Sequence, residues 1–166
     1  MNAQHYHALP EALSLLDLPR GKVRSTVERL KAANSITRGN FGGHESPPIT
    51  ARDVATILLA LASPTASGAA VTATTLGRLP IYYGSGPPTA LDAITSIVEV
   101  GAFMRCADIP QDGELILGVG RPEMIVRSGD TVWHYRPDVL PLPAARFTLT
   151  IPIKTIADIS RRLLIN

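Results

Sequence analysis

The sequence predicts an α+β protein, with three helices near its N-terminus and an antiparallel sheet with a packed helix near its C-terminus. Apolar residues recur at helical spacing in residues 1–62, whereas polar and apolar residues alternate from residue 114 onward. The stretch 63–88 between them is rich in Ala, Ser, Thr, Gly and Pro, which is typical of a linker. We therefore expect a helical domain at 1–62, a linker at 63–88 and an α+β domain for oligomerisation or partner binding at 89–166.

Two helices separated by a tight turn are predicted at the start of the chain. The first begins at Pro10, since proline suits the first turn of a helix, and ends near Leu16. Pro19 disfavours a helical conformation at the residue before it, so the chain should turn at 17–19. A second helix is then expected over 20–33, with Asn34 as its left-handed C-terminal cap.

The second helix is predicted to be apolar on one side and basic on the other. Val23, Val27 and Leu30 recur at helical spacing and form an apolar seam. At about 100° of rotation per residue, the side opposite the seam carries Arg24, Ser25, Glu28 and Arg29. Such a helix can lie along a phosphate backbone and offer side chains to base edges, which favours a recognition helix for DNA. An ordinary surface helix with solvated charges is the alternative.

The segment LPEALSLLDLPRGKVRSTVERLKAANSITR, residues 9–38, resembles the helix-turn-helix and winged-helix DNA-binding regulators. VRSTVERLKAAN looks like their recognition helix, and Ile36 lies in the strand that would follow. The resemblance covers under a fifth of the chain and implies a three-helix helix-turn-helix region, with or without a wing, at 1–62. Two features depart from the family pattern: Asp17 or Leu18 stands where the turn glycine is usual, and the cap that is often glycine is Asn34.

The resemblance also implies which side chains face DNA. They are Arg20, Lys22, Arg24, Ser25 and Arg29, to which we add Lys31 and Arg38 from the same basic stretch. The segment 35–38 is expected to form a strand, and the loop GNFGGHESPP after it would be the wing, with Arg38 and His44 near the minor groove or the phosphates. A flexible connector is an equally good interpretation of that loop.

Capping residues predict the remaining helices, and the alternation of polar and apolar residues predicts the strands. Thr50 and Asp53 form a capping box that starts a helix over 51–62, which would close a three-helix core. Thr89 and Asp92 repeat this pattern and start a helix that ends near residue 100. Strands are expected at 114–119, 123–128, 131–136 and 145–151, with a tight turn at 128–130 and a further strand near 79–83. A final helix should begin after residue 152.

Composition limits the class of protein. A hydrophobic content of 45% indicates a folded chain. The net charge is only +2, and a basic patch on a near-neutral body suits a specific contact with nucleic acid or an acidic protein better than general coating. The single cysteine, Cys106, excludes an internal disulfide and a closed cysteine zinc cage. Neither a secretory signal nor a bilayer-spanning apolar stretch is visible, so we expect a cytoplasmic protein without membrane contact.

No catalytic or metal-binding motif is visible. His5 and His7 form an H-x-H pair, but two ligands without a third make a poor metal site. Cys106 and His134 have the chemistry of a nucleophile and a base, yet nothing in the sequence brings them together. Trp133 could stack on single-stranded bases from its predicted strand, although a core position is favoured for it. We expect no enzymatic activity, no metal and no cofactor.

These observations favour a protein that binds double-stranded DNA in a sequence-specific way, most simply a transcriptional regulator. One short helix reads few base pairs, so useful specificity needs two half-sites and a homo-oligomer, most simply a dimer. Two alternatives stay open. One is the DNA-recognition subunit of a viral packaging machine, and the other is a protein-interaction module whose basic helix docks on an acidic partner. The sequence does not separate them.

Overall fold

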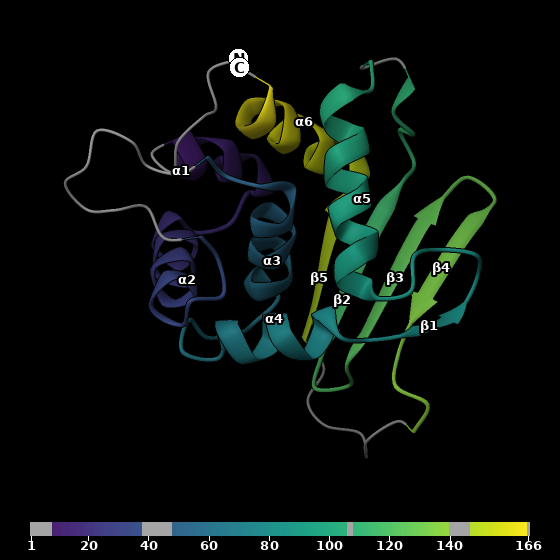
Figure 1. The fold of residues 1–166 in the computed structure, drawn as a ribbon, viewed down its shortest axis with the longest axis horizontal. Helices are drawn as coiled ribbons and strands as arrows, with labels where there is room; N and C mark the ends of the chain where they lie inside the picture. Colours follow the sequence, from purple (N-terminus) through teal and green to yellow (C-terminus); the bar gives the residue numbers. More distant parts are fainter. Residues whose placement is uncertain (1–7, 38–47, 106–107, 140–146, 166) are drawn as a thin grey trace.

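The structure, a computed structural model, describes residues 8–37, 48–105, 108–139 and 147–165. Within them the chain forms helices beside a five-stranded antiparallel sheet, so the α+β expectation is confirmed (Figure 1). The helices are α1 Leu9–Leu13, the short 3-10 helix η2 Ser14–Leu16, α2 Arg20–Ala32, α3 Ala51–Leu61, α4 Ala69–Gly77, α5 Ala90–Phe103 and α6 Ile153–Leu164. The strands are β1 Ile81–Tyr83, β2 Glu114–Val119, β3 Glu123–Ser128, β4 Thr131–Tyr135 and β5 Phe147–Pro152.

The sheet has the strand order β1-β4-β3-β2-β5, and all neighbouring strands are antiparallel. β3 and β4 form the predicted hairpin, and Gly129 takes a φ of 53° in its turn, a conformation that favours glycine. Side chains alternate between the two faces of each strand, and the register places Leu117, Val126 and Trp133 on the same face of the sheet. α5 lies over one face of the sheet (Figure 1). Ile97 and Gly101 of α5 line a cavity together with Val126 and Trp133 of the sheet.

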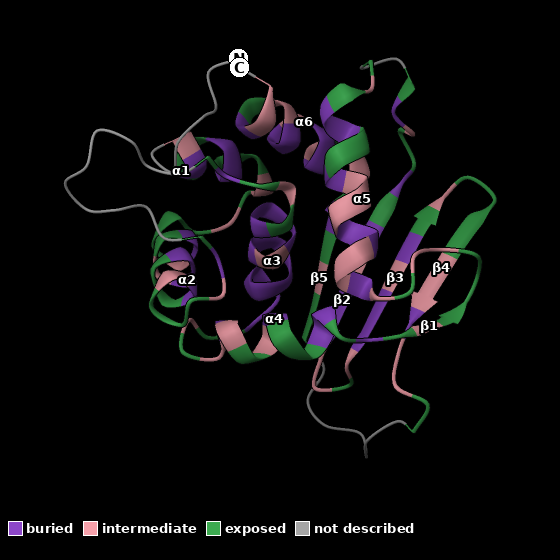
Figure 2. Cartoon of the chain, viewed as in Figure 1, coloured by how far each residue is buried: buried purple, intermediate pink, exposed green. Residues whose placement is uncertain are grey.

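α3 is the central helix of the helical part and is buried along most of its length, as Figure 2 shows. It packs against α2, α4 and α5. α1 contacts α6, so the first and the last described helices are neighbours in space. One continuous hydrophobic core therefore includes side chains from the N-terminal helices, from the sheet and from α6.

The expectation of a linker at 63–88 is wrong, because much of this stretch forms α4 and β1. Ala69, Ala73 and Leu76 recur at helical spacing and are buried. Alanine has the highest helix propensity, and its small side chain lets α4 pack closely on α3. The composition resembles that of a linker, whereas the spacing of the small apolar residues produces a helix. The strand expected near 79–83 is confirmed as β1.

The segment after α2 also differs from the prediction. Residues 35–37 form no strand, and Thr37 instead donates its backbone N–H to the carboxylate of Asp53 at 2.9 Å. Ile36 is buried in the core. The segment is therefore held by a side chain from α3 and by its own apolar residue, not by strand pairing. Arg38 and residues 39–47 of the proposed wing lie outside the described residues.

The capping signals read from the sequence are confirmed. Thr50 Oγ1 accepts a hydrogen bond from the Asp53 N–H at 3.1 Å, and the Asp53 carboxylate accepts one from the Thr50 N–H at 3.0 Å, which completes the capping box of α3. Thr89 Oγ1 accepts from the Asp92 N–H at 3.2 Å at the start of α5. Asn34 has a φ of 53° and is the left-handed residue expected after α2. α5 itself continues past its expected end.

Candidate nucleic-acid interface

The backbone from α1 to α2 follows a helix, a turn and a second helix. Asp17 has φ 53° and ψ 32°, the left-handed conformation that a turn glycine usually takes. Pro19 follows with φ −54° and ψ 126° and precedes the first residue of α2. This layout is compatible with a helix-turn-helix, although other helical folds share it.

The inner face of α2 is held in the core. Val23, Val27 and Leu30 are all buried, as the apolar seam predicts, and Leu30 has no exposed surface. Thr26 is also buried, which the spacing of apolar residues did not reveal because threonine is polar. α2 packs against α1, α3 and α4. Three neighbouring helices therefore fix which side of α2 faces solvent.

The outer face of α2 is open to solvent, as the exposed residues in Figure 2 show. It carries cations along two edges. At about 100° of rotation per residue, one edge carries Arg20, Arg24 and Lys31, and the nearly opposite edge carries Lys22 and Arg29. The arginines are exposed and the lysines are half-buried. The surface between the edges consists of Gly21, Ser25, Glu28 and Ala32. All these residues together are called the α2 face below.

The three arginines of the α2 face are not neutralised by the described part of the protein. Arg20, Arg24 and Arg29 form no ion pair with a described residue. Lys31 differs, since its Nζ lies 3.3 Å from Oε1 of the exposed Glu28, one turn earlier in the helix. The α2 face therefore presents guanidinium groups whose hydrogen-bond donors can reach an external acceptor.

The N-terminal end of α2 adds a second source of positive potential. Its first turn contains no acidic residue, and Pro19 provides no side-chain cap. The N–H groups of a first turn and the helix dipole favour an anion at that end. Arg20 and Lys22 add two cations there. Ser25, one turn later, donates its hydroxyl proton to the Gly21 carbonyl at 2.8 Å, so its oxygen is left to accept a hydrogen bond from a ligand.

A groove with a volume of about 570 Å³ lies between α1 and α2. Glu11 and Glu28 line this groove together with Arg20 and Arg24. The two carboxylates lower the positive potential along the edge of α2 that holds these arginines. The two edges of α2 therefore differ in positive potential, since Arg29 does not line this groove.

The aromatic side chains at the end of β4 belong to the core side of the sheet. Tyr135 is fully buried, and its hydroxyl donates to the Pro87 carbonyl at 3.0 Å. Burial raises the pKa of Tyr135 to about 12, and the negative charge of Asp92 adds to the shift. Trp133 is half-buried and packs against the core, in agreement with the position favoured from the sequence.

His134 lies on the other face of β4. Its ring meets that of Tyr82 edge-on with the centroids 6.0 Å apart, and the guanidinium carbon of Arg136 lies 3.5 Å from the centre of the Tyr82 ring. Burial lowers the pKa of His134, and the charges of Arg136 and Arg121 lower it further. Its Nε2 is 3.5 Å from Glu123 Oε2, but a neutral imidazole makes this a polar contact near pH 7 and not an ion pair.

Metal and membrane sites are not found in the described part of the chain. Its residues contain no group of three His, Cys, Asp or Glu side chains that could hold a metal ion. No helix among them is both long enough and apolar enough to cross a bilayer. His5, His7 and Cys106 lie outside the described residues, as does Arg38 among the expected DNA contacts.

Comparison with known proteins gives no independent indication of function. No family model matches the chain, and neither a curated protein nor a solved structure matches it. The resemblance to helix-turn-helix regulators therefore depends on the residues of α1 and α2 alone.

Proposed function

We propose that this protein binds double-stranded DNA by placing the α2 face in the major groove. The observation that carries the proposal is an exposed helix face with cations on two nearly opposite edges and small side chains between them. Packing against three other helices holds that face toward solvent. A helix whose arginines, on both edges, form no ion pair with a described residue suits a ligand that is negatively charged on both sides, as a DNA groove is.

The dimensions of the groove fit this arrangement. A helix with its side chains is about 10–12 Å wide, and the major groove of B-DNA is about 12 Å wide. Arg24 and Arg29, on different edges, can then reach the phosphates of opposite strands. The absence of a side chain at Gly21 lets the backbone approach the base edges. Glu28 and Ser25 lie on the same central strip and supply acceptors for base amino groups.

The proposed biological role is that of a transcriptional regulator that acts as a homodimer. A single α2 contacts only a few base pairs, so a specific site needs two copies of the helix about one turn of DNA apart. The C-terminal sheet and α6 are the part of the chain to which we assign self-association. A DNA-recognition subunit of a packaging machine would use the same helix but would assemble into a ring of many copies.

Fluorescence anisotropy with a labelled random duplex tests DNA binding directly. We expect binding at about 50 mM salt that weakens steeply by about 200 mM, because each phosphate contact releases a condensed counterion. Arg24→Gln and Arg29→Gln should each reduce the slope of log affinity against log salt by about 0.9. Arg105→Gln is the control, since Arg105 is an exposed arginine outside α2, the sheet and α6.

Glu11→Gln gives a test in the opposite direction. Removing this carboxylate from the groove beside Arg20 and Arg24 should strengthen duplex binding.

An absence of duplex binding at low salt would overturn the proposal and favour a protein-interaction module whose basic helix docks on an acidic partner. If duplex binding is observed, selection from a random library should enrich a two-fold symmetric site, whereas a ring-shaped assembly in a mass measurement would favour the packaging role.

A further inference from the structure

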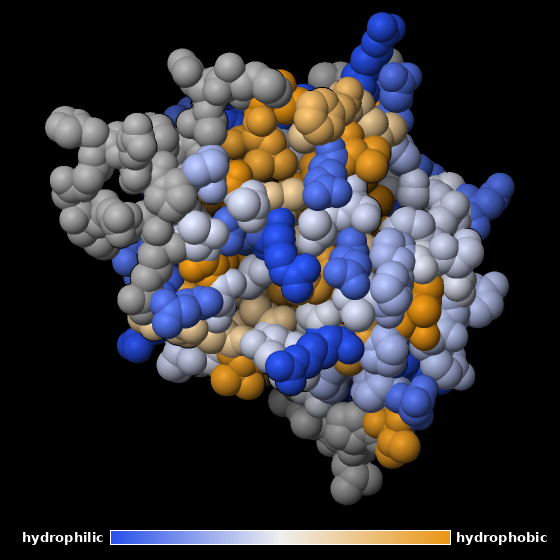
Figure 3. Space-filling view, in the orientation of Figure 1, coloured by the Kyte–Doolittle hydropathy of each residue, from blue (hydrophilic) through white to orange (hydrophobic). Residues whose placement is uncertain are grey.

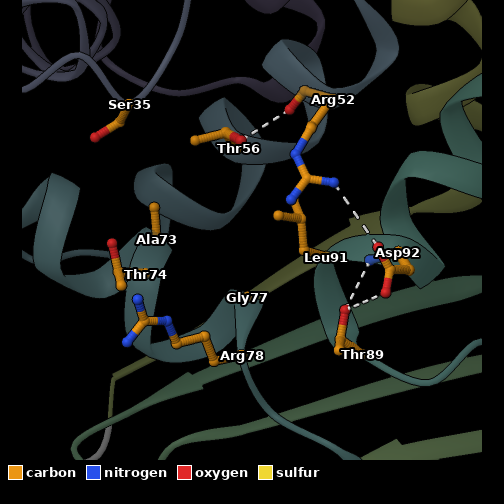
Figure 4. A pocket seen from close by; sticks show the side chains of 10 residues that line it. All are labelled: Ser35, Arg52, Thr56, Ala73, Thr74, Gly77, Arg78, Thr89, Leu91 and Asp92. Atoms are coloured by element: carbon orange, nitrogen blue, oxygen red, sulfur yellow. Dashed lines mark hydrogen bonds and ion pairs between the residues drawn. The ribbon is translucent and has the colours of Figure 1, made fainter.

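A polar pocket with a volume of about 390 Å³ lies where α3, α4 and the start of α5 meet (Figure 4). It opens on a face where hydrophilic side chains gather over these three helices (Figure 3). Small-molecule sites commonly have volumes of about 300–1,000 Å³, so the pocket can hold a small metabolite. None of the described residues that are expected to contact DNA lines it.

Two arginines from different helices line the pocket. Arg52 comes from the first turn of α3, and Arg78 caps the C-terminal end of α4. The side chain of Arg52 is 65% exposed, and its Nη1 is 3.8 Å from Asp92 Oδ1, a distance too long for a hydrogen bond. Arg78 forms no ion pair with a described residue. Two guanidinium groups against one carboxylate leave the pocket with a net positive charge.

Three threonine hydroxyl groups of the pocket can accept hydrogen bonds but have already donated their own protons. The hydroxyl of Thr56 donates to the Arg52 carbonyl at 2.8 Å, and the hydroxyl of Thr74 donates to the Ala70 carbonyl at 2.9 Å. The hydroxyl of Thr89 donates to Asp92 Oδ2 at 2.6 Å. These oxygens therefore suit ligand hydroxyl groups and cannot donate to an anion.

The pocket thus combines cationic donors with neutral and anionic acceptors. Guanidinium groups bind phosphate with paired hydrogen bonds, and a carboxylate oxygen accepts from sugar hydroxyls. Asp92 Oδ1 can take this role, because the Thr89 hydroxyl bonds to the other oxygen and Arg52 Nη1, 3.8 Å from Oδ1, is too far away for a hydrogen bond. Leu91 and Ala73 add an apolar wall. A ligand with a phosphate at one end and hydroxyl groups at the other satisfies both sets of partners.

We propose that this pocket binds a small phosphorylated sugar. Its phosphate lies between Arg52 and Arg78, and its hydroxyl groups donate to Asp92 and Thr56. This site goes beyond the proposed DNA binding, because it uses other residues and needs no nucleic acid. Its test is done on the full chain without DNA, so the outcome is independent of whether the α2 face binds a duplex.

Isothermal titration with ribose 5-phosphate, inorganic phosphate and ribose as separate probes tests the site. We expect ribose 5-phosphate to bind more tightly than either of its parts. Arg52→Gln and Arg78→Gln should each weaken its binding about tenfold, because each removes a charged hydrogen-bond donor. Arg162→Gln should leave binding unchanged. Both substituted arginines are exposed, and equal melting temperatures for variants and parent protein will show that the fold is kept.

Asp92→Asn separates the two ends of the ligand. It removes a negative charge near the phosphate, so binding of inorganic phosphate should stay the same or strengthen, whereas the advantage of ribose 5-phosphate over phosphate should shrink. The proposal is overturned if ribose 5-phosphate does not bind at about 10 mM, a concentration that detects even weak complexes. Equal binding by Arg52→Gln, Arg78→Gln and the parent protein would also overturn it. Equal affinities of the parent protein for phosphate and ribose 5-phosphate would overturn the assignment to a sugar.

Discussion

Asp53 accepts two hydrogen bonds from Thr37, one from the backbone N–H at 2.9 Å and one from the hydroxyl at 3.1 Å. The same carboxylate accepts from the Thr50 N–H at 3.0 Å while it caps α3. Thr37 and Thr50 are thirteen positions apart in the chain, and one buried side chain holds both of them at the start of α3. The residue that caps α3 therefore also forms a long-range contact with Thr37.

Asp53→Ala should be strongly destabilising. The substitution removes the capping box and leaves the polar groups of Thr37 and Thr50 without their acceptor, which should lower the free energy of unfolding by about 3 kcal/mol. Urea denaturation measures this change. Glu99→Ala is the control, because Glu99 is exposed on α5 and its loss should change stability by less than about 0.5 kcal/mol. Equal effects of the two substitutions would contradict the role of Asp53.

Tyr135→Phe tests the buried hydroxyl at the end of β4. The variant loses the hydrogen bond to the Pro87 carbonyl, so the free energy of unfolding should fall by about 1 kcal/mol at neutral pH. In the parent protein the raised pKa means that folding favours the neutral phenol. Its contribution is complete below an ordinary tyrosine pKa of about 10 and is lost as pH rises toward about 12. Denaturation between these pH values should therefore show a steeper loss for the parent protein than for Tyr135→Phe.

His134 should make the protein less stable in mild acid. Its pKa is lowered in the folded state, so the unfolded chain binds a proton first as pH falls below the ordinary value of about 6.5. The stability that comes from keeping the imidazole neutral is present above that value and is lost on acidification. His134→Gln should therefore lose less stability than the parent protein between pH 7.5 and pH 5.5, as measured by melting temperature. An equal loss would show that other groups carry the acid sensitivity.

Two glycines in helices should respond oppositely to substitution by alanine. A Cβ at Gly101 would lie 3.0 Å from Ala157 Cα, because α5 and α6 approach closely there. Gly101→Ala should therefore destabilise the protein by about 1–3 kcal/mol despite the better helix propensity of alanine. A Cβ at Gly21 would meet nothing within 4 Å, so Gly21→Ala should be neutral or stabilising by about 0.5 kcal/mol. Thermal melting of both variants checks the contrast.

The DNA-binding proposal gives Gly21→Ala a second use. If α2 enters a groove, a methyl group on the central strip should weaken duplex binding although it does not harm the fold. Binding that is unchanged in this variant would indicate that the centre of the α2 face does not approach the bases closely. The measurement therefore separates contact by the whole face from contact by its two cationic edges alone.

Much of the secondary structure could be predicted because its causes are local. Thr50 with Asp53 and Thr89 with Asp92 cap helices through residues three positions apart, and Asn34 ends α2 through its own backbone preference. The basic outer side of α2 was predicted for the same reason. Helical spacing determines which side chains share a face, and burial of Val23 and Leu30 then decides which face is left to solvent.

The sequence by itself determined the capped helices α3 and α5, the β3–β4 hairpin and the charge of one face of α2, since neighbours within a few positions set each of them. The spacing of Ala69 and Ala73 suits a helix, but tertiary packing against α3 decided that this stretch is buried as α4, although its composition suggests a linker. Tertiary packing also brought Thr37 to Asp53, and Arg52 and Arg78 to a shared pocket. These contacts join residues far apart in the chain, and their geometry depends on how whole helices pack, which local spacing does not encode.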